Sequence, residues 1–152
     1  MAERARKPVT RPSAFWDTSA LVPLCVRQGS TPQAMTLYKS YAVVVWWATS
    51  VEIASALARL VRMKHLDSSE WTQARKLAAA LADTWSVVQP SDALRAQATL
   101  LVNQYDLRAA DALQLAAALE WCGNLPQGRV FVTADHALQQ AAVVTGFDGK
   151  RI

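Results

Sequence analysis

Hydrophobic positions in this chain fall into two kinds of segment that alternate along its length. Short runs of β-branched and aromatic residues, such as AVVVWWA at 42–48 and RVFVT at 129–133, are typical of strands covered on both faces of a parallel sheet. The longer segments between them begin with capping patterns such as Asp67-x-x-Glu70 and are interpreted as helices. Because parallel neighbours need crossover connections, this alternation predicts an α/β domain.

The pattern predicts four clear strands and seven helices. The strands are expected at 13–17, 42–48, 86–89 and 129–135. The helices are expected at 18–29, 30–41, 49–66, 67–85, 91–106, 108–122 and 136–146. The final segment, GFDGKRI, leaves a fifth strand open. We therefore expect three layers, in which a mostly parallel central sheet of four to five strands is flanked by about seven helices, with ligands beyond the carboxyl ends of the strands.

Composition and charge narrow the class of protein. The chain has 152 residues, of which 52% are hydrophobic and 18% charged, and this indicates one soluble globular domain. Its longest apolar run is too short to span a bilayer and no signal-type segment follows the charged start, so we expect a cytoplasmic protein without membrane association. Residues 1–14 are expected to form a basic mobile tail and residues 15–152 the domain. The net charge of +4 suggests a polyanionic partner, and the tail supplies part of that charge.

Four carboxylates fall where a parallel sheet would bring them together. Asp17 ends the first predicted strand and Asp135 follows the last clear one, so both are expected at the same sheet edge. Glu52 and Asp111 lie in the first turns of helices entered from that edge. Each acid alone is also explained as a helix cap, as part of the pattern Thr49-x-x-Glu52, or as a complement to a helix dipole. Those explanations do not account for a shared edge, nor for an acid within the alanine- and leucine-rich segment RAADALQLAAAL.

Carboxylates gathered at one edge repel each other, and a bound cation relieves that repulsion. Ligand sets made only of oxygen favour Mg²⁺ or Mn²⁺. Zinc is not expected, because His65 and His136 each stand alone, without a second histidine or a cysteine at ligand spacing. The sequence therefore predicts a magnesium or manganese site.

Four short segments around these acids resemble, in order, the motifs of PIN-domain ribonucleases, in particular the VapC-type toxins of bacterial toxin–antitoxin pairs. The segments are FWDTSALV, SVEIASAL, LRAADALQLAAAL and VTADHAL, and the resemblance covers residues 15 to about 147. It implies a PIN-like fold and Mg²⁺- or Mn²⁺-dependent endonucleolytic cleavage of RNA by metal-activated water. It also implies a small antitoxin protein as a partner.

The motif match assigns the catalytic and metal-binding positions to Asp17, Glu52, Asp111 and Asp135. Asp17 and Asp111 are expected to bind the ion directly and Asp135 to complete its site. Glu52 is expected to hold the metal-bound water or to help deprotonate it. Two hydroxyl positions near the metal are matched by Ser19 and Thr133.

Two arginines are candidates for contact with RNA. Arg59 lies two helical turns after Glu52 on the same face, and a purely solvated role explains it equally well. Arg108 precedes Asp111 by three residues and is suited either to bind phosphate or to pair with that acid. We further expect the antitoxin to dock near the predicted hairpin at 50–85, and we expect a homodimer.

Three alternative functions make different demands on the sequence. A phosphorelay receiver needs a phosphoacceptor aspartate after a middle strand and a lysine after a later one, and neither is in place. A haloacid-dehalogenase-type phosphatase needs a second aspartate two residues after the first, where this chain has Ser19. A catalytically silent PIN-like module that binds protein or RNA stays open as the alternative, although it would not require all four acids.

Overall fold

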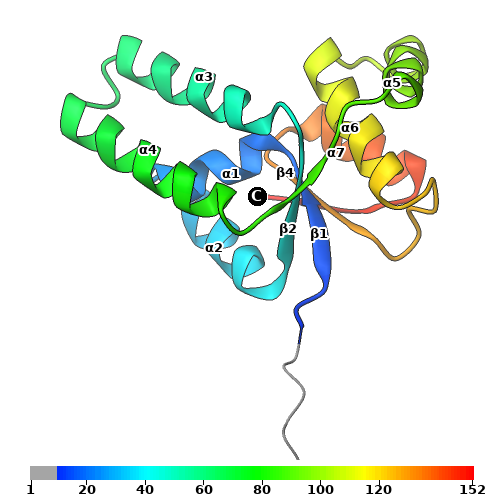
Figure 1. The fold of residues 1–152 in the computed structure, drawn as a ribbon, viewed down its shortest axis with the longest axis horizontal. Coiled ribbons are helices and arrows are strands. Elements are labelled where there is room, and N and C mark those ends of the chain that lie inside the picture. The colour runs from blue at the N-terminus through cyan, green and yellow to red at the C-terminus, as the bar shows by residue number, and fades with distance from the viewer. Residues whose placement is uncertain (1–9) are drawn as a thin grey trace, which may run out of the picture.

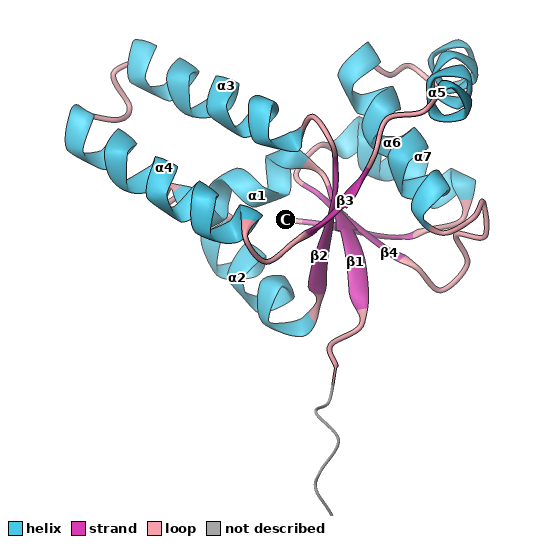
Figure 2. Cartoon of the chain, in the orientation of Figure 1, coloured by secondary structure: helices cyan, strands magenta, loops and turns pink. Residues whose placement is uncertain are grey.

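Strands and helices alternate along residues 10–152, the part of the chain described by the structure, which is a computed structural model (Figures 1 and 2). The strands are β1 (Ser13–Trp16), β2 (Ala42–Trp46), β3 (Ser86–Val88), β4 (Val130–Thr133) and β5 (Asp148–Arg151). The helices are α1 (Thr18–Cys25), α2 (Thr31–Ser40), α3 (Thr49–Arg62), α4 (Ser68–Ala82), α5 (Asp92–Gln104), α6 (Ala109–Trp121) and α7 (His136–Thr145).

All strand pairs in the sheet are parallel, and the strand order is β3-β2-β1-β4-β5. The chain therefore starts at the centre with β1, builds outward through β2 and β3, and then returns to place β4 on the other side of β1. The order reverses between β1 and β4. In open parallel sheets, the crevice outside the carboxyl ends at such a reversal is the usual place for a ligand.

Helices cover both faces of the sheet, because residues along each strand point alternately to opposite sides. Ala14 and Trp16 face the layer formed by α1 to α4, and Phe15 between them faces the layer of α5 to α7. On the latter face, the rings of Phe15 and Phe131 stack with centroids 5.4 Å apart. This three-layer arrangement, with five strands and seven helices in the described residues, confirms the predicted fold class.

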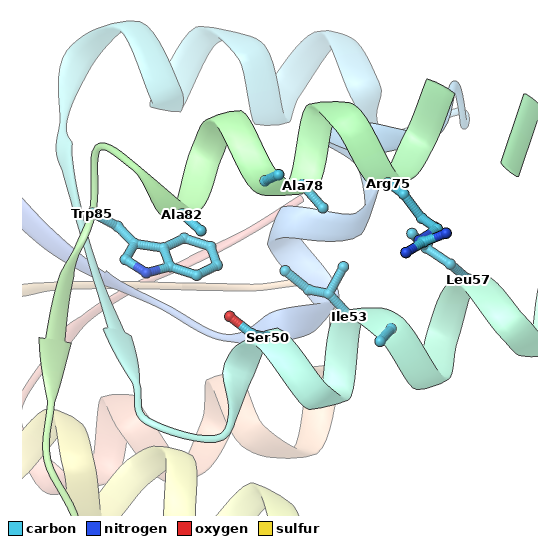
Figure 3. A pocket seen from close by; sticks show the side chains of 9 residues that line it. Ser50, Ile53, Leu57, Arg75, Ala78, Ala82 and Trp85 are labelled. Atoms are coloured by element: carbon cyan, nitrogen blue, oxygen red, sulfur yellow. The ribbon is translucent and has the colours of Figure 1, made fainter. Parts of the chain in front are cut away.

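The α3–α4 hairpin extends from the sheet as two helices lying side by side (Figure 1). A shallow apolar groove of about 180 Å³ runs between the two helices (Figure 3). Ile53 and Leu57 line it from α3, Ala78 and Ala82 line it from α4, and Trp85 closes one end. The hairpin therefore presents a partly open apolar surface beside the main body of the domain.

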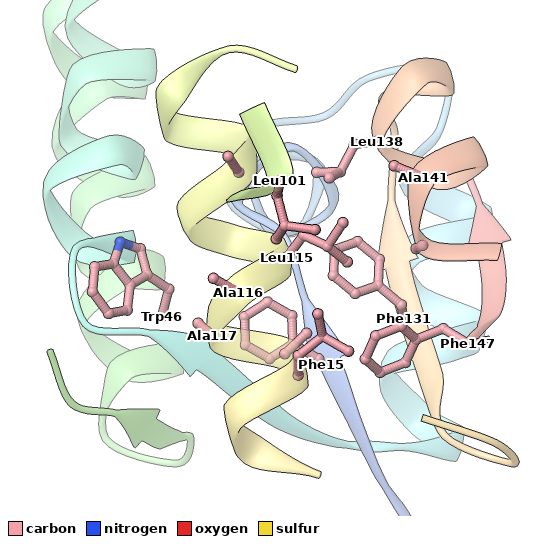
Figure 4. Packing of buried hydrophobic residues seen from close by; sticks show 14 of the residues in the cluster. Phe15, Trp46, Leu101, Leu115, Ala116, Ala117, Phe131, Leu138, Ala141 and Phe147 are labelled. Atoms are coloured by element: carbon pink, nitrogen blue, oxygen red, sulfur yellow. The ribbon is translucent and has the colours of Figure 1, made fainter. Parts of the chain in front are cut away.

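The core against α5, α6 and α7 is built around the aromatic rings of the sheet (Figure 4). Leu115 and the small side chains of Ala116 and Ala117 bring α6 close to Phe15, and Phe147 packs beside Phe131. Alanine in this helix permits close approach to the strands, which explains the composition of RAADALQLAAAL. A polar residue on the same helix is then unexpected unless it has a specific partner.

Two boundaries differ from the sequence predictions. The final segment does form a strand, β5, which pairs with β4 from Val130 opposite Asp148 onward. The tail was predicted to extend to residue 14, but Ser13 and Ala14 belong to β1, and the Arg11 guanidinium donates to the Tyr38 carbonyl at 2.7 Å. The domain therefore begins earlier than predicted, and residues 1–9 of the predicted tail lie outside the described residues. Within residues 10–152, no helix is long and apolar enough to cross a membrane.

Candidate active site

A cleft of about 400 Å³ opens where β1 and β4 end, at the reversal of strand order. All four acids predicted from the sequence line it: Asp17, Glu52, Asp111 and Asp135. They come from four separate elements, namely the end of β1, the first turns of α3 and α6, and the start of α7. The fold thus brings together side chains that lie more than a hundred residues apart in the chain.

Asp17 is the most buried of these acids, with 4% of its surface exposed. Its backbone N–H donates to the Val132 carbonyl at 2.9 Å and so joins the end of β1 to β4. The hydroxyls of Ser19 and Thr133 both donate to its Oδ2 atom. Asp17 precedes α1 directly, yet its carboxylate makes no capping hydrogen bond of normal geometry. Capping therefore does not explain a buried aspartate here.

The two hydroxyls singled out by motif match also tie the cleft to the end of β4. Ser19 Oγ accepts from the Ala134 N–H at 2.9 Å, and Thr133 Oγ1 accepts from the Asp135 N–H at 3.0 Å. The same two hydroxyl oxygens lie 3.2 Å apart. The side chains of Ser19 and Thr133 thus hold Asp17 in position and fix the backbone that leads to Asp135.

Glu52 does not form the capping box predicted from Thr49-x-x-Glu52. Helix α3 begins at Thr49, with Ala48 at the cap position, so the Thr49 side chain lies inside the first turn with its hydroxyl buried and unpaired. The Glu52 carboxylate turns into the cleft, where its Oε1 atom accepts from Gln114 Nε2 at 3.2 Å. A capping box therefore does not account for Glu52.

Asp111 and Asp135 differ in whether their side chains cap a helix. Asp111 lies in the first turn of α6, where no side chain caps the helix. Asp135 is a true N-cap of α7, because its Oδ1 atom accepts from the Leu138 N–H at 2.7 Å. Of the four acids, Asp135 alone has a capping bond that accounts for its presence.

Burial raises the pKa values of three acids in the cleft, and repulsion by neighbouring acids adds to the rise for two of them. Burial raises the pKa of Asp17, against the effect of the hydroxyls that bond to it. Burial, and then the charge of Asp17, raise the pKa of Glu52. The pKa of Asp111 rises from 3.8 to about 6, first through burial and then through the charges of Asp17 and Asp135, while Arg108 opposes the rise. Such a site favours the binding of positive charge.

The metal-free protein is expected to lose stability as the pH rises from about 4 to about 6. Over this range folded Asp111 holds a proton that the unfolded chain has released, so the free energy of unfolding falls as the pH rises. The loss from Asp111 is roughly 1 to 2 kcal/mol once solvent screening is allowed for. Urea unfolding of the parent and Asp111→Asn at both ends of this range measures it. Equal pH dependence in the two proteins would contradict the raised pKa of Asp111.

The donors in the cleft fit Mg²⁺ or Mn²⁺ better than zinc. No histidine or cysteine lines it, and His65 and His136 are both exposed. As they stand in residues 10–152, no three histidine, cysteine, aspartate or glutamate side chains are grouped so that they could hold an ion. Mg²⁺ commonly binds through one or two carboxylates, several waters and a substrate phosphate, and this ligand set suits separated carboxylates.

Both predicted arginines are exposed, and Arg59 lines the cleft, whereas Arg108 precedes α6 at its cap position. Arg59 lies on α3, and Arg108 lies close enough to Asp111 to lower the pKa of that acid. Across the described residues, neither arginine forms an ion pair within 4 Å with an acid of the cleft. Both guanidinium groups are therefore available for a phosphate.

Gln114 is a residue of the site that was not predicted from the sequence. It lies on α6, three residues after Asp111, and has no exposed surface. The signal was present, because Gln114 is the one amide among the alanines and leucines of RAADALQLAAAL. A polar residue one turn after an acid of the site shares its helix face.

Comparisons with known proteins show likeness of fold. No model of a protein family matches the chain, and no curated protein sequence matches it. A toxin–antitoxin complex from Klebsiella pneumoniae is similar with a TM-score of 0.64 at 17% identity, over 92% of this chain and 100% of the other. VapC20, a sarcin-ricin loop cleaving toxin of Mycobacterium tuberculosis, is similar with a TM-score of 0.65 at 20% identity, and the match covers 92% of this chain and 100% of VapC20. PAE2754 from Pyrobaculum aerophilum is similar with a TM-score of 0.62 at 19% identity, and the match covers 93% of this chain and 88% of PAE2754.

These likenesses confirm the fold that the four motifs imply. The chain has a three-layer, PIN-like architecture that it shares with these structures, VapC20 among them. At such low identity, the shared architecture alone does not carry an activity from one protein to another.

Proposed function

We propose that this chain is a metal-dependent endoribonuclease and the toxin of a toxin–antitoxin pair. The observation that carries the proposal is the meeting of four acids from four elements in one cleft, where a capping bond accounts for Asp135 alone. The likeness in fold to VapC20, an RNA-cleaving toxin, and to a protein of a toxin–antitoxin complex supports it. The motif resemblance points the same way.

In the proposed reaction, three of the acids would bind the metal ion and the fourth would accept a proton. Asp17 and Asp111 would hold Mg²⁺ or Mn²⁺, and Asp135 would complete the site. The bound ion would lower the pKa of a water molecule and stabilise the charge that develops on the phosphate. Glu52, whose pKa is raised, is suited to accept the proton of the attacking water. Arg59, on the wall of the cleft, would contact a phosphate of the RNA.

The direct test is an RNA cleavage assay with the purified chain and Mg²⁺, Mn²⁺ or EDTA. Cleavage with either ion and none with EDTA is the expected result. An inert protein on every RNA offered would favour the alternative, a PIN-like module that binds RNA or protein without cutting. RNA binding without cleavage, measured by filter retention, would then identify that module.

Millimolar Mn²⁺ is expected to raise the Tm of the protein. An ion bound only by the folded acids stabilises the fold by mass action and relieves their repulsion, and about 3 to 5 °C is expected at ten times Kd. Differential scanning calorimetry of the parent and of Asp111→Asn measures the shift, which the substitution should largely abolish. An equal shift in both proteins would place the ion elsewhere.

We also propose that a small antitoxin docks on the α3–α4 hairpin and sends an arginine or lysine into the acidic cleft. A guanidinium can bind paired carboxylates and so compete with the metal ion. Among the large apolar side chains of α4, Leu77 is 39% exposed, whereas Trp71 and Leu81 are half-buried. An apolar partner helix would fit the groove between α3 and α4 in Figure 3 better than it would fit these three side chains. A homodimer is expected in addition, and light scattering would detect it.

A further inference from the structure

We infer that Gln114 is a positioning residue that fixes the Glu52 carboxylate from the helical layer opposite α3. The inference rests on the proposed nuclease function, since it assigns a role within that same site. Glu52 projects from α3, whereas Gln114 projects from α6, and the two helices belong to different layers. A hydrogen bond between the two side chains therefore joins the two layers at Glu52.

The Gln114 side-chain amide bonds to two residues on two other helices. Gln114 Nε2 lies 3.2 Å from Glu52 Oε1 and 3.1 Å from Thr18 Oγ1, and donates a hydrogen bond to each. Thr18 follows Asp17 directly at the start of α1. One NH₂ group thus uses both of its protons to connect α6 with α1 and α3 around the acidic cleft.

Stability does not account for this residue. Gln114 has no exposed surface, and its Oε1 atom is buried without a hydrogen-bond partner. An unpaired buried carbonyl is unfavourable, whereas leucine or methionine would fill a similar volume with no polar atom to satisfy. The neighbours of Gln114 on α6 are indeed leucine and alanine. We attribute the presence of glutamine at this position to the fixed orientation that it gives the Glu52 side chain.

Helix α6 then governs two acids of the cleft. It carries Asp111 itself, and one turn later it carries the amide that holds Glu52. Without the amide, Glu52 stays in the first turn of α3, but its Oε1 atom loses the hydrogen bond that α6 supplies. We expect this loss to act on the chemical step rather than on RNA binding.

Gln114→Met tests the inference, because methionine keeps the length of the side chain and removes the donor. The expected result is a kcat roughly tenfold lower, the loss typical of removing a supporting hydrogen bond at a metal site, with KM unchanged within about twofold. The Tm should stay the same or rise. Gln139→Met is the matched control, since its Nε2 donates to the Gly149 carbonyl at 3.1 Å and not to the cleft, and it should keep the parent kcat.

A double-variant cycle separates positioning from a general structural effect. In a Glu52→Gln background the amide no longer has a carboxylate to hold, so Gln114→Met should lower kcat by less than about twofold further. If the two substitutions act independently, so that their reductions in kcat multiply, the inference is overturned. Full activity of Gln114→Met, or failure of both Gln114→Met and Gln114→Leu to fold, would also overturn it. A parent that is inert on RNA would overturn the proposed function itself, an outcome distinct from all of these.

Discussion

Replacing Asp111 with asparagine is expected to lower RNA cleavage by more than about 100-fold, beyond the range typical of losing an outer partner of a metal. The substitution keeps the size of the side chain and removes the charge that would hold the ion. Asp17→Asn is expected to be as damaging, because the Asp17 carboxylate lies buried at the base of the cleft. Initial rates on one RNA at saturating Mn²⁺ measure both effects.

These losses should occur in folded proteins. Each substitution removes one of the repelling charges, so without metal the Tm should stay level or rise. Asp83→Asn is a matched control, since Asp83 lies exposed at the end of α4 and outside the cleft, and its cleavage rate should equal that of the parent. If folded Asp17→Asn and Asp111→Asn cleave as fast as the control, the site is wrongly assigned.

Expression of the chain alone is expected to stop cell growth, and co-expression with the small neighbouring reading frame should restore it. Asp111→Asn should be harmless with or without that partner, because the growth arrest would arise from cleavage of RNA. Colony counts after induction measure both effects. A parent chain that is harmless although it cleaves RNA in vitro, with no partner co-purifying from its native host, would leave a nuclease without a toxin role.

The docking groove is tested with a charge placed on one face of α4. Ala79 is exposed and lines the groove, so Ala79→Glu should abolish co-purification of the partner and leave cells arrested in its presence. Ala80 is the next residue and is equally exposed, but it does not line the groove. Ala80→Glu should therefore keep the partner bound. Equal behaviour of the two variants would place the partner on another surface.

The placement of the acids was predictable because strand ends carry strong positional information. Once β1 and β4 are predicted as parallel strands, Asp17 and Asp135 must leave the sheet at the same edge. Strand β5 was harder to predict, since DGKR contains no β-branched or aromatic residue, and it is pairing with β4 that makes it a strand. Its conformation depends on a neighbour rather than on its own side chains.

The contacts within the site were not predictable from local patterns. Thr49-x-x-Glu52 has the spacing of a capping box, but the helix begins at Thr49 and the glutamate faces the cleft. The partner of Gln114 depends on how α6 crosses α1 and α3, which no segment of the sequence specifies alone. Side chains that join separate layers are visible only after the layers are assembled.

The order in which the strands join the sheet has a consequence for synthesis on the ribosome. Asp17, Glu52 and Asp111 all emerge before β4, yet Asp17 takes its hydroxyl partner Thr133 and its backbone partner Val132 from that strand. Domains begin to fold from the part of the chain made first, at about 5 to 20 residues per second. A nascent chain therefore carries an unfinished cleft until β4 inserts beside β1.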